Sequence, residues 1–196
     1  MPNARPQRSD LVARLAIALA TALLYTLAYS VNETFDELAV YAQGVSLIFL
    51  PAGVRTVMIL VGGRWAALGA GVALAFMAHG IWPEMSLPVL VGYAAVSSVT
   101  AWLAISTMLR LLKIPRDLSG LRFAHLPIID LVTTLAHAFV VNSYFVLFGL
   151  RSPDHIADTA LAMAFGDFVG TGVVMVVLMA LLSVRRVFAA QASDNT

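Results

Sequence analysis

Six apolar stretches fill most of this chain, and no other feature constrains its fold as strongly. They cover residues 11–30, 44–61, 65–81, 87–109, 126–147 and 157–184. A helix needs about 20 apolar residues to cross the hydrocarbon core of a bilayer, which is about 30 Å thick. Only 12% of the 196 residues are charged, too few to cover a water-soluble domain of this size. The sequence predicts an all-α polytopic membrane helix bundle with about six transmembrane helices in a lipid bilayer.

The positive charges predict how this bundle is oriented. In a six-span chain the N-terminus, residues 62–64, the loop at 110–124 and the C-terminus share one side. Of the 12 Lys and Arg residues, ten fall on that side, Arg151 falls on the other, and Arg55 lies within a span. Such an excess is typical of cytoplasmic loops. We therefore expect both termini in the cytoplasm, and the chain in the inner membrane of a bacterium.

The boundaries of the apolar stretches predict one domain with short polar ends. Residues 1–10 are expected to form a cytoplasmic segment, residues 11–188 the transmembrane domain, and residues 189–196 a disordered cytoplasmic tail. The three residues from Gly62 to Arg64 predict a tight antiparallel turn between the second and third spans. Pro51 and Gly53 weaken a helix, so the second span is expected to be kinked, broken or partly re-entrant at that point.

Ionisable residues inside spans are the main candidates for a functional site. Each costs about 2.5–3.5 kcal/mol to insert, and so needs a partner, a water-filled cavity or neutralisation. Arg55 could bind an anionic group at a broken helix, neutralise a buried carboxylate, or extend to the inner surface. Asp167 lies between Gly166 and Gly170, a small-xxx-small pair that predicts close helix packing and an interior position. An ion pair between Arg55 and Asp167 is the simplest hypothesis.

The fifth span carries a second polar group of residues. Asp130, Thr134 and His137 lie within about 60° of one another on one helix face, at 100° per residue. This stripe could line a proton path, contact a ligand, or form a hydrogen-bonded network between helices with no ligand.

Several function classes are excluded or disfavoured by what the sequence lacks. It has no cysteine, which excludes disulfides, thiol catalysis and iron–sulfur clusters. It has no phosphate-binding lysine loop, zinc-protease helix, nucleophile elbow or dinucleotide fingerprint. We therefore expect no enzyme, no cofactor, no metal site and no binding of nucleic acid.

Two surfaces are candidates for contact with a protein partner. The loop with Arg110, Lys113 and Arg116 is basic, and it is expected to face anionic lipid headgroups or to dock a cytoplasmic protein. Ala16 and Ala20, spaced by four on one face of the first span, are a candidate only because the chain resembles a class of transporter subunits described below.

Three short motifs resemble the membrane-associated sensor domains of the first MASE type. They are the segment FLPAGV at 49–54, the segment GGRWAALG at 62–69, and Gly166-Asp167 with Gly170. The resemblance implies a polytopic bacterial inner-membrane module that perceives a signal. The chain differs from that family in having about six spans instead of more, and no kinase or cyclase domain follows Arg186. A sensory role would therefore act through a separate partner.

A second resemblance concerns architecture. Substrate-binding S components of vitamin transporters are also six-span proteins of this length, and their first helix docks through alanines spaced by four. The leading hypothesis is a non-catalytic sensor-like or ligand-binding membrane module that uses a separate protein partner and a small-molecule ligand. The alternatives are an S-component-like transporter subunit and a structural accessory subunit of a larger membrane complex.

Overall fold

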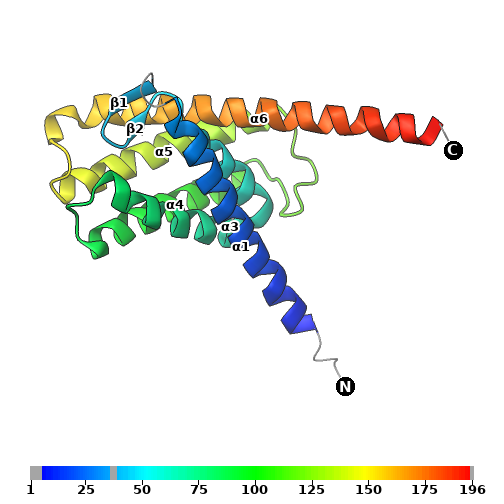
Figure 1. Cartoon of the computed structure of the whole chain (residues 1–196), viewed down its shortest axis with the longest axis horizontal. Helices are drawn as coiled ribbons and strands as arrows, with labels where there is room; N and C mark the ends of the chain where they lie inside the picture. The colour runs from blue at the N-terminus through cyan, green and yellow to red at the C-terminus, as the bar shows by residue number, and fades with distance from the viewer. Residues whose placement is uncertain (1–5, 36–38, 195–196) are drawn as a thin grey trace.

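The computed structural model describes the backbone of residues 6–35 and 39–194, and the side chains of residues 10–35 and 39–185. Five long helices dominate it (Figure 1). They are α1 (Pro6–Glu33), α3 (Leu50–Ile81), α4 (Leu87–Leu111), α5 (His125–Leu147) and α6 (Ile156–Asp194). All five are long and apolar enough to cross a membrane. The prediction of an all-α chain with helices long and apolar enough to cross a membrane is therefore confirmed.

A short β-hairpin, which the sequence analysis did not predict, precedes α3. Strand β1 (Val40–Ala42) pairs in antiparallel fashion with β2 (Val45–Ser46), and Gly44 makes the turn with φ +72°. The backbone then stays non-helical as far as Phe49. The second span was expected to be helical from residue 44, but helix α3 begins only at Leu50.

The expected helix break at Pro51 and Gly53 is wrong. Pro51 lies in the first turn of α3, where backbone N–H groups have no acceptor within the helix, so proline loses no hydrogen bond there. Gly53 is helical as well. The non-helical residue is Gly63, with φ 57° and ψ −135°, a conformation that a residue without Cβ adopts readily.

The break at Gly63 reverses the direction of the chain. A straight helix of 32 residues would be about 48 Å long. However, Gln43 Nε2 donates to the carbonyl of Ile81 at 2.9 Å, so the segment before α3 touches its last residue. The seven Cα-to-Cα steps from Gln43 to Leu50 span at most about 25 Å. The two halves of α3 therefore form the antiparallel pair that the Gly62–Arg64 turn predicted.

The last helix is longer than expected. A one-turn 3-10 helix, η1 (Pro153–His155), leads into α6, which continues to Asp194. Residues 189–194, which were expected to be disordered, are helical, while Asn195 and Thr196 lie outside the described residues. A run of good helix formers through residue 192 accounts for the extension.

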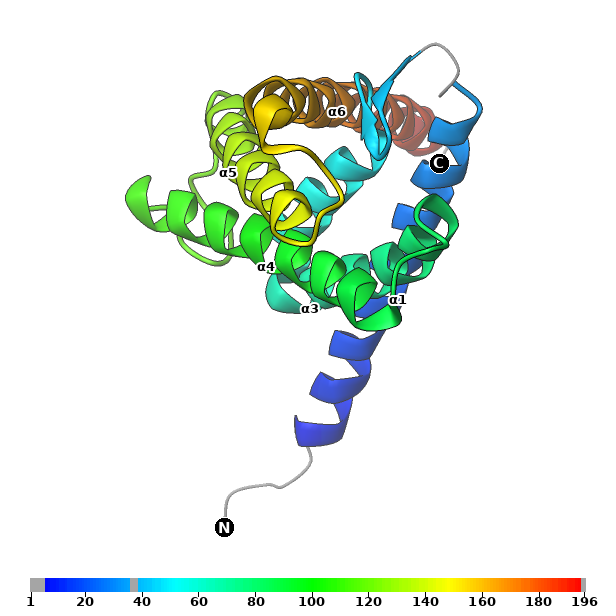
Figure 2. The ribbon, with the colours of Figure 1, turned by 90° about the vertical axis from the view of Figure 1, so that its left-hand side faces the viewer.

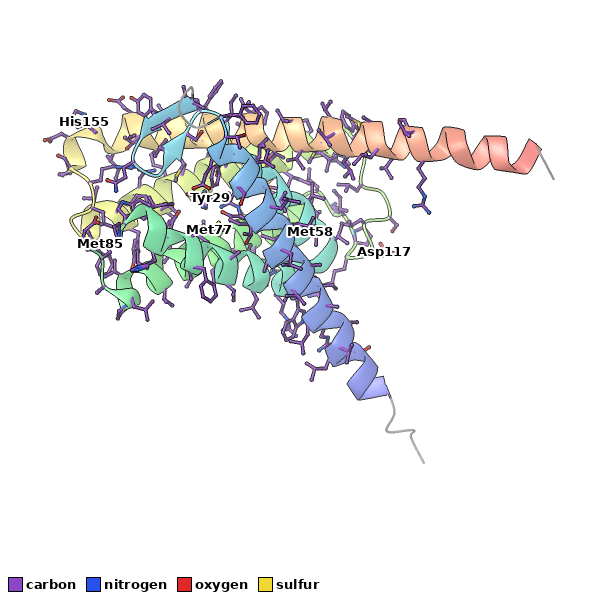
Figure 3. All side chains as sticks on the ribbon, in the orientation of Figure 1. Tyr29, Met58, Met77, Met85, Asp117 and His155 are labelled. Carbon is purple, nitrogen blue, oxygen red and sulfur yellow. The ribbon has the colours of Figure 1, made fainter. Side chains whose placement is uncertain are left out.

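The first half of α3 lies in the middle of the bundle. Figure 2 shows this cyan stretch enclosed by α1, the second half of α3, α4, α5 and α6. The N-terminal part of α1 and the C-terminal part of α6 project from the same end of the bundle (Figure 1). Figure 3 places Asp117 at that end, and Met85 and His155 at the opposite end, next to the hairpin.

Two apolar clusters form the core, one toward each end of the bundle. Near the hairpin, the rings of Trp82, Tyr93 and Phe145 pack in edge-on or tilted arrangements, with centroids 5.0–5.5 Å apart. Toward the other end, the core contains Ile59, Ala101, Ile105 and Ile129 among others. Polar residues occupy the layer between these clusters, and they make up the candidate site.

Candidate functional site

Four helices each contribute one residue to a buried polar cluster, which we call the Arg55 cluster. Its members are Arg55 from α3, Ser97 from α4, His137 from α5 and Asp167 from α6. Arg55 Nη2 donates to Asp167 Oδ2 at 2.8 Å, so the ion pair suggested by the sequence is present. Both side chains are only 2% exposed. A charge pair this deep requires full hydrogen bonding to offset its desolvation.

The contacts of His137 fix its tautomer. Arg55 Nη1 lies 2.8 Å from His137 Nε2, and a guanidinium can only donate. Nε2 must therefore accept, which places the ring hydrogen on Nδ1. From there it donates to Asp167 Oδ2 at 3.0 Å. Ser97 Oγ lies 2.8 Å from the same Nε2 and also accepts from Arg55 Nη1 at 3.4 Å. In this arrangement the imidazole is neutral, and the cluster contains one positive and one negative charge.

Asp130 is buried apart from this ion pair. It is 3% exposed, and it accepts a hydrogen bond from Thr56 Oγ1 at 3.1 Å. The hydroxyl of Thr171 on α6 donates instead to the backbone carbonyl of Asp167, at 2.9 Å. Among the residues whose side chains are described, no cation lies within ion-pairing distance of Asp130. The structure therefore separates the two acids: Asp167 pairs with Arg55, and Asp130 accepts a hydrogen bond from the hydroxyl of Thr56.

The polar stripe expected on α5 does not act as one unit. Asp130, Thr134 and His137 are all buried, as a shared interior face requires. However, Thr134 Oγ1 donates to the carbonyl of Leu131 on its own helix, at 3.1 Å. His137 joins the Arg55 cluster, whereas Asp130 joins Thr56. The three residues share one face of α5, but each of them bonds to a different neighbour.

A small chamber borders the Arg55 cluster. Its volume is about 20 Å³ for the centre of a water-sized sphere, which is room for about one water molecule. Tyr25, Tyr93, Met163 and the hairpin segment complete its walls, together with all four members of the Arg55 cluster. Polar groups and a little free space therefore meet at the centre of the bundle.

A larger vestibule lies on the hairpin side of the chamber. By the same measure its volume is about 160 Å³. Residues of α1, the hairpin, Phe49, the second half of α3 and Tyr93 of α4 line it. The vestibule and the chamber share five lining residues, Gly44, Val45, Ser46, Phe49 and Tyr93. The segment that follows β1 therefore lies at the boundary between the two spaces.

Several hydrogen bonds hold this boundary segment in place. Arg151 Nη2 donates to the carbonyl of Gln43 at 2.9 Å, and Nη1 donates to Asn142 Oδ1. The side chain of Asn32 accepts from the backbone N–H of Leu50 at 2.9 Å. Burial lowers the pKa of Arg151, which lies outside the membrane-spanning helices, while its guanidinium also packs 5.2 Å from the centroid of Phe145.

The glycines of α6 explain how the segment before α3 reaches the bundle centre. A Cβ atom at Gly166 would overlap the carbonyl oxygen of Ser46, and one at Gly170 would overlap that of Phe49. A Cβ at Gly53 would lie 2.7 Å from Cβ of Val174. The backbones therefore approach as closely as a small-xxx-small pattern permits. Because Asp167 lies between these glycines, the same contact brings its carboxylate to Arg55.

The residues expected to dock a partner lie away from the cluster. Arg110, Lys113 and Arg116 are exposed at the Asp117 end of the bundle. Ala16 and Ala20 are exposed on α1, whereas Ala18 packs against Gly69. The side chains of Arg5, Arg8 and Arg186, which contribute to the predicted charge asymmetry, lie outside the described residues.

Sequence reasoning missed several residues that complete the site. Ser97, Tyr25 and Tyr93 lie in apolar runs, and serine and tyrosine are common in membrane helices. Thr56, which follows Arg55 directly, carried the one usable signal, a hydroxyl beside a buried charge. Asn142 is fully buried and bonds to Arg151 and to the carbonyl of Ala138.

Comparisons of the chain with family models, curated proteins and solved structures found no match. The resemblances to MASE sensor domains and to S components therefore stay predictions from short motifs and from architecture.

Proposed function

We propose that this chain is a non-catalytic module of the bacterial inner membrane that binds a small ligand at the Arg55 cluster and signals through a separate protein. One observation carries the proposal: a buried Arg–Asp–His–Ser cluster, built from four helices, borders a chamber that adjoins a larger vestibule. Buried charge that served packing alone would need no adjoining space. Charged residues inside membrane bundles characteristically face ligand or ion pathways.

The proposed topology has six spans with both termini in the cytoplasm. The reversal at Gly63 supports counting the two halves of α3 as separate spans. The ends of the bundle support the sidedness, since Asp117 in the basic loop lies opposite His155 and Met85 (Figure 3). In this orientation the vestibule opens toward the periplasm, and a ligand enters from outside the cell.

The cluster offers a direct route from ligand to partner. A ligand that takes hydrogen bonds from Arg55 changes the contacts that hold α3, α4, α5 and α6 together. Helix α6 runs from Asp167 in the cluster to Asp194, on the proposed cytoplasmic side. A small shift or rotation of α6 would then reach a partner docked beside the basic loop. Such a ligand can shift α6 only if it binds the shifted and the unshifted arrangement of the helices with different affinities.

Purification in lipid nanodiscs followed by mass spectrometry of bound small molecules tests this proposal. We expect a ligand to accompany the wild-type protein and to be lost from Arg55→Met. The matched control is Arg122→Met, which removes an exposed guanidinium at the opposite end and should retain the ligand. Equal ligand content in the two variants, or none in the wild type, would contradict binding at the cluster.

A second candidate function is a substrate-binding subunit of a small-solute transporter. The exposed Ala16 and Ala20 favour it, because they leave a small-residue face of α1 free while Ala18 packs inward. Co-purification with an ATPase pair and a coupling membrane protein would support transport. Co-purification with a cyclase or two-component protein would support sensing. A stoichiometric place in a larger membrane complex, with no ligand, would support an accessory role.

A further inference from the structure

Two buried donors at the chamber lack a hydrogen-bond partner among the described residues. They are Nε of Arg55 and the hydroxyl of Tyr25. Both residues line the chamber, and both are at least 98% buried. Buried polar groups almost always have partners, because an unmet donor costs about as much as its desolvation. The Nη1 and Nη2 groups of Arg55 are already engaged, in three hydrogen bonds to Asp167, His137 and Ser97. An acceptor atom in the chamber would satisfy the remaining two donors.

The charges around the chamber are already balanced. Arg55 and Asp167 neutralise each other at 2.8 Å, and the tautomer of His137 makes its ring neutral. A ligand with a net charge would therefore bring an uncompensated charge into a low-dielectric site. A neutral oxygen acceptor meets both donors without that penalty.

The vestibule has the same neutral character. Its described polar lining consists of Tyr29, Asn32, Gln43, Ser46 and Tyr93, and none of its lining side chains is charged. Arg151 donates to the carbonyl of Gln43, but its side chain lines neither space. Amide and hydroxyl groups on an otherwise apolar wall suit a small polar molecule without formal charge.

We propose that the ligand is a small uncharged solute with a hydrogen-bond-accepting oxygen, such as a carbonyl. Its oxygen lies in the chamber between Tyr25 Oη and Arg55 Nε, and its remaining atoms lie in the vestibule. The two volumes fit this division, because the chamber holds one water-sized group and the vestibule is about eight times larger (160/20). The inference rests on the proposed function and adds the chemical class of its ligand.

The absence of cysteine from the chain permits a direct test of charge selection. Ser46→Cys places one thiol between the two spaces, at a position that is 9% exposed. Ser86→Cys is the matched control, an exposed position at the same end whose side chain makes no capping hydrogen bond. Each variant is treated, from the outer side of oriented vesicles, with uncharged methyl methanethiosulfonate and with its anionic sulfonatoethyl and cationic trimethylammonioethyl analogues.

We expect Ser46→Cys to react with both charged reagents at least about tenfold more slowly than with the uncharged one, after division by the rates at Ser86→Cys. Equal normalised rates for all three reagents would overturn the ligand class but leave entry from outside intact. No reaction with any reagent would overturn the proposed entry route as well. If Ser46→Cys does not fold, Ala42→Cys on the vestibule wall replaces it.

Protection by acetamide tests the acceptor position. This probe carries a carbonyl oxygen and no charge. It should slow the modification of Ser46→Cys by the uncharged reagent, and acetate at equal concentration should slow it less. Adding Tyr25→Phe, which removes only the hydroxyl, should abolish the difference between the two probes. Protection that is unaffected by Tyr25→Phe, or that is stronger with acetate, would overturn the proposed recognition.

Discussion

Asp167→Asn removes one charge from the buried ion pair with almost no change in shape. Asp167 Oδ2 accepts from Arg55 at 2.8 Å and from His137 at 3.0 Å, and the side chain is 2% exposed. The variant leaves the Arg55 guanidinium buried without a counter-charge. Loss of one partner from such a pair costs about 3–5 kcal/mol. For a chain of this length, that free energy corresponds to a fall in Tm of about 6–20 °C.

Thermal unfolding in nanodiscs, followed by circular dichroism, measures this change. Asp158→Asn is the matched control, because it makes the same substitution at an exposed position in the first turn of α6. It should cost less than about 1 kcal/mol, the usual contribution of an acid near a helix N-terminus. The double variant Arg55→Met/Asp167→Asn should be more stable than Asp167→Asn alone, since it leaves no unpaired charge. If Asp167→Asn unfolds within 2 °C of Asp158→Asn, or if the double variant is simply additive, the pair does not stabilise the bundle as argued.

Four further variants test the packing of glycines and the hydrogen bonds of Arg151. Gly166→Ala should lower the free energy of unfolding by about 1–3 kcal/mol, because its Cβ overlaps the carbonyl of Ser46. In contrast, Gly172→Ala on the same helix meets nothing within 4 Å and should be neutral or stabilising by up to about 1 kcal/mol in the same unfolding assay. Gly63→Ala should cost about 1–3 kcal/mol because of its positive φ, and an unchanged Tm would show that the turn relaxes. Arg151→Met removes two hydrogen bonds near the hairpin and should speed modification of Ser46→Cys at least about fivefold; an unchanged rate would show that Arg151 does not restrain it.

The turn between the halves of α3 shows why parts of the fold were predictable. Gly62 and Gly63 interrupt an apolar run next to Arg64, and that local signal predicts a reversal. The break expected at Pro51 was wrong for a reason that local sequence does not contain. Hydropathy continues unbroken from residue 44 to 61, so it does not reveal that the hairpin and the extended segment displace the start of the helix to Leu50. Pro51 then occupies a first turn instead of a helix interior.

The candidate site also contains residues that the sequence predicts and residues that it does not. Arg55 and Asp167 are rare charges in apolar helices, and the cost of burying each alone predicts that they meet. Ser97 and Tyr25 have no such signature, because a hydroxyl within an apolar helix can find a hydrogen-bond partner in many different positions. Their roles follow only from the crossing of α4 and α1 with α3, which places one beside Arg55 and the other at the chamber.

The sequence alone determined that this chain forms long helices apolar enough to cross a membrane, and it determined which charges had to find partners. Both follow from transfer free energies, which depend on residue type and length of run and on little else. Only the tertiary structure decided which partners those charges have, where the chamber and vestibule lie, and why Asp130 stays apart from Asp167. These depend on helix crossings that glycines such as Gly166 and Gly170 permit, and a contact across 112 residues of chain, like that of Arg55 with Asp167, acquires its geometry only when the helices pack.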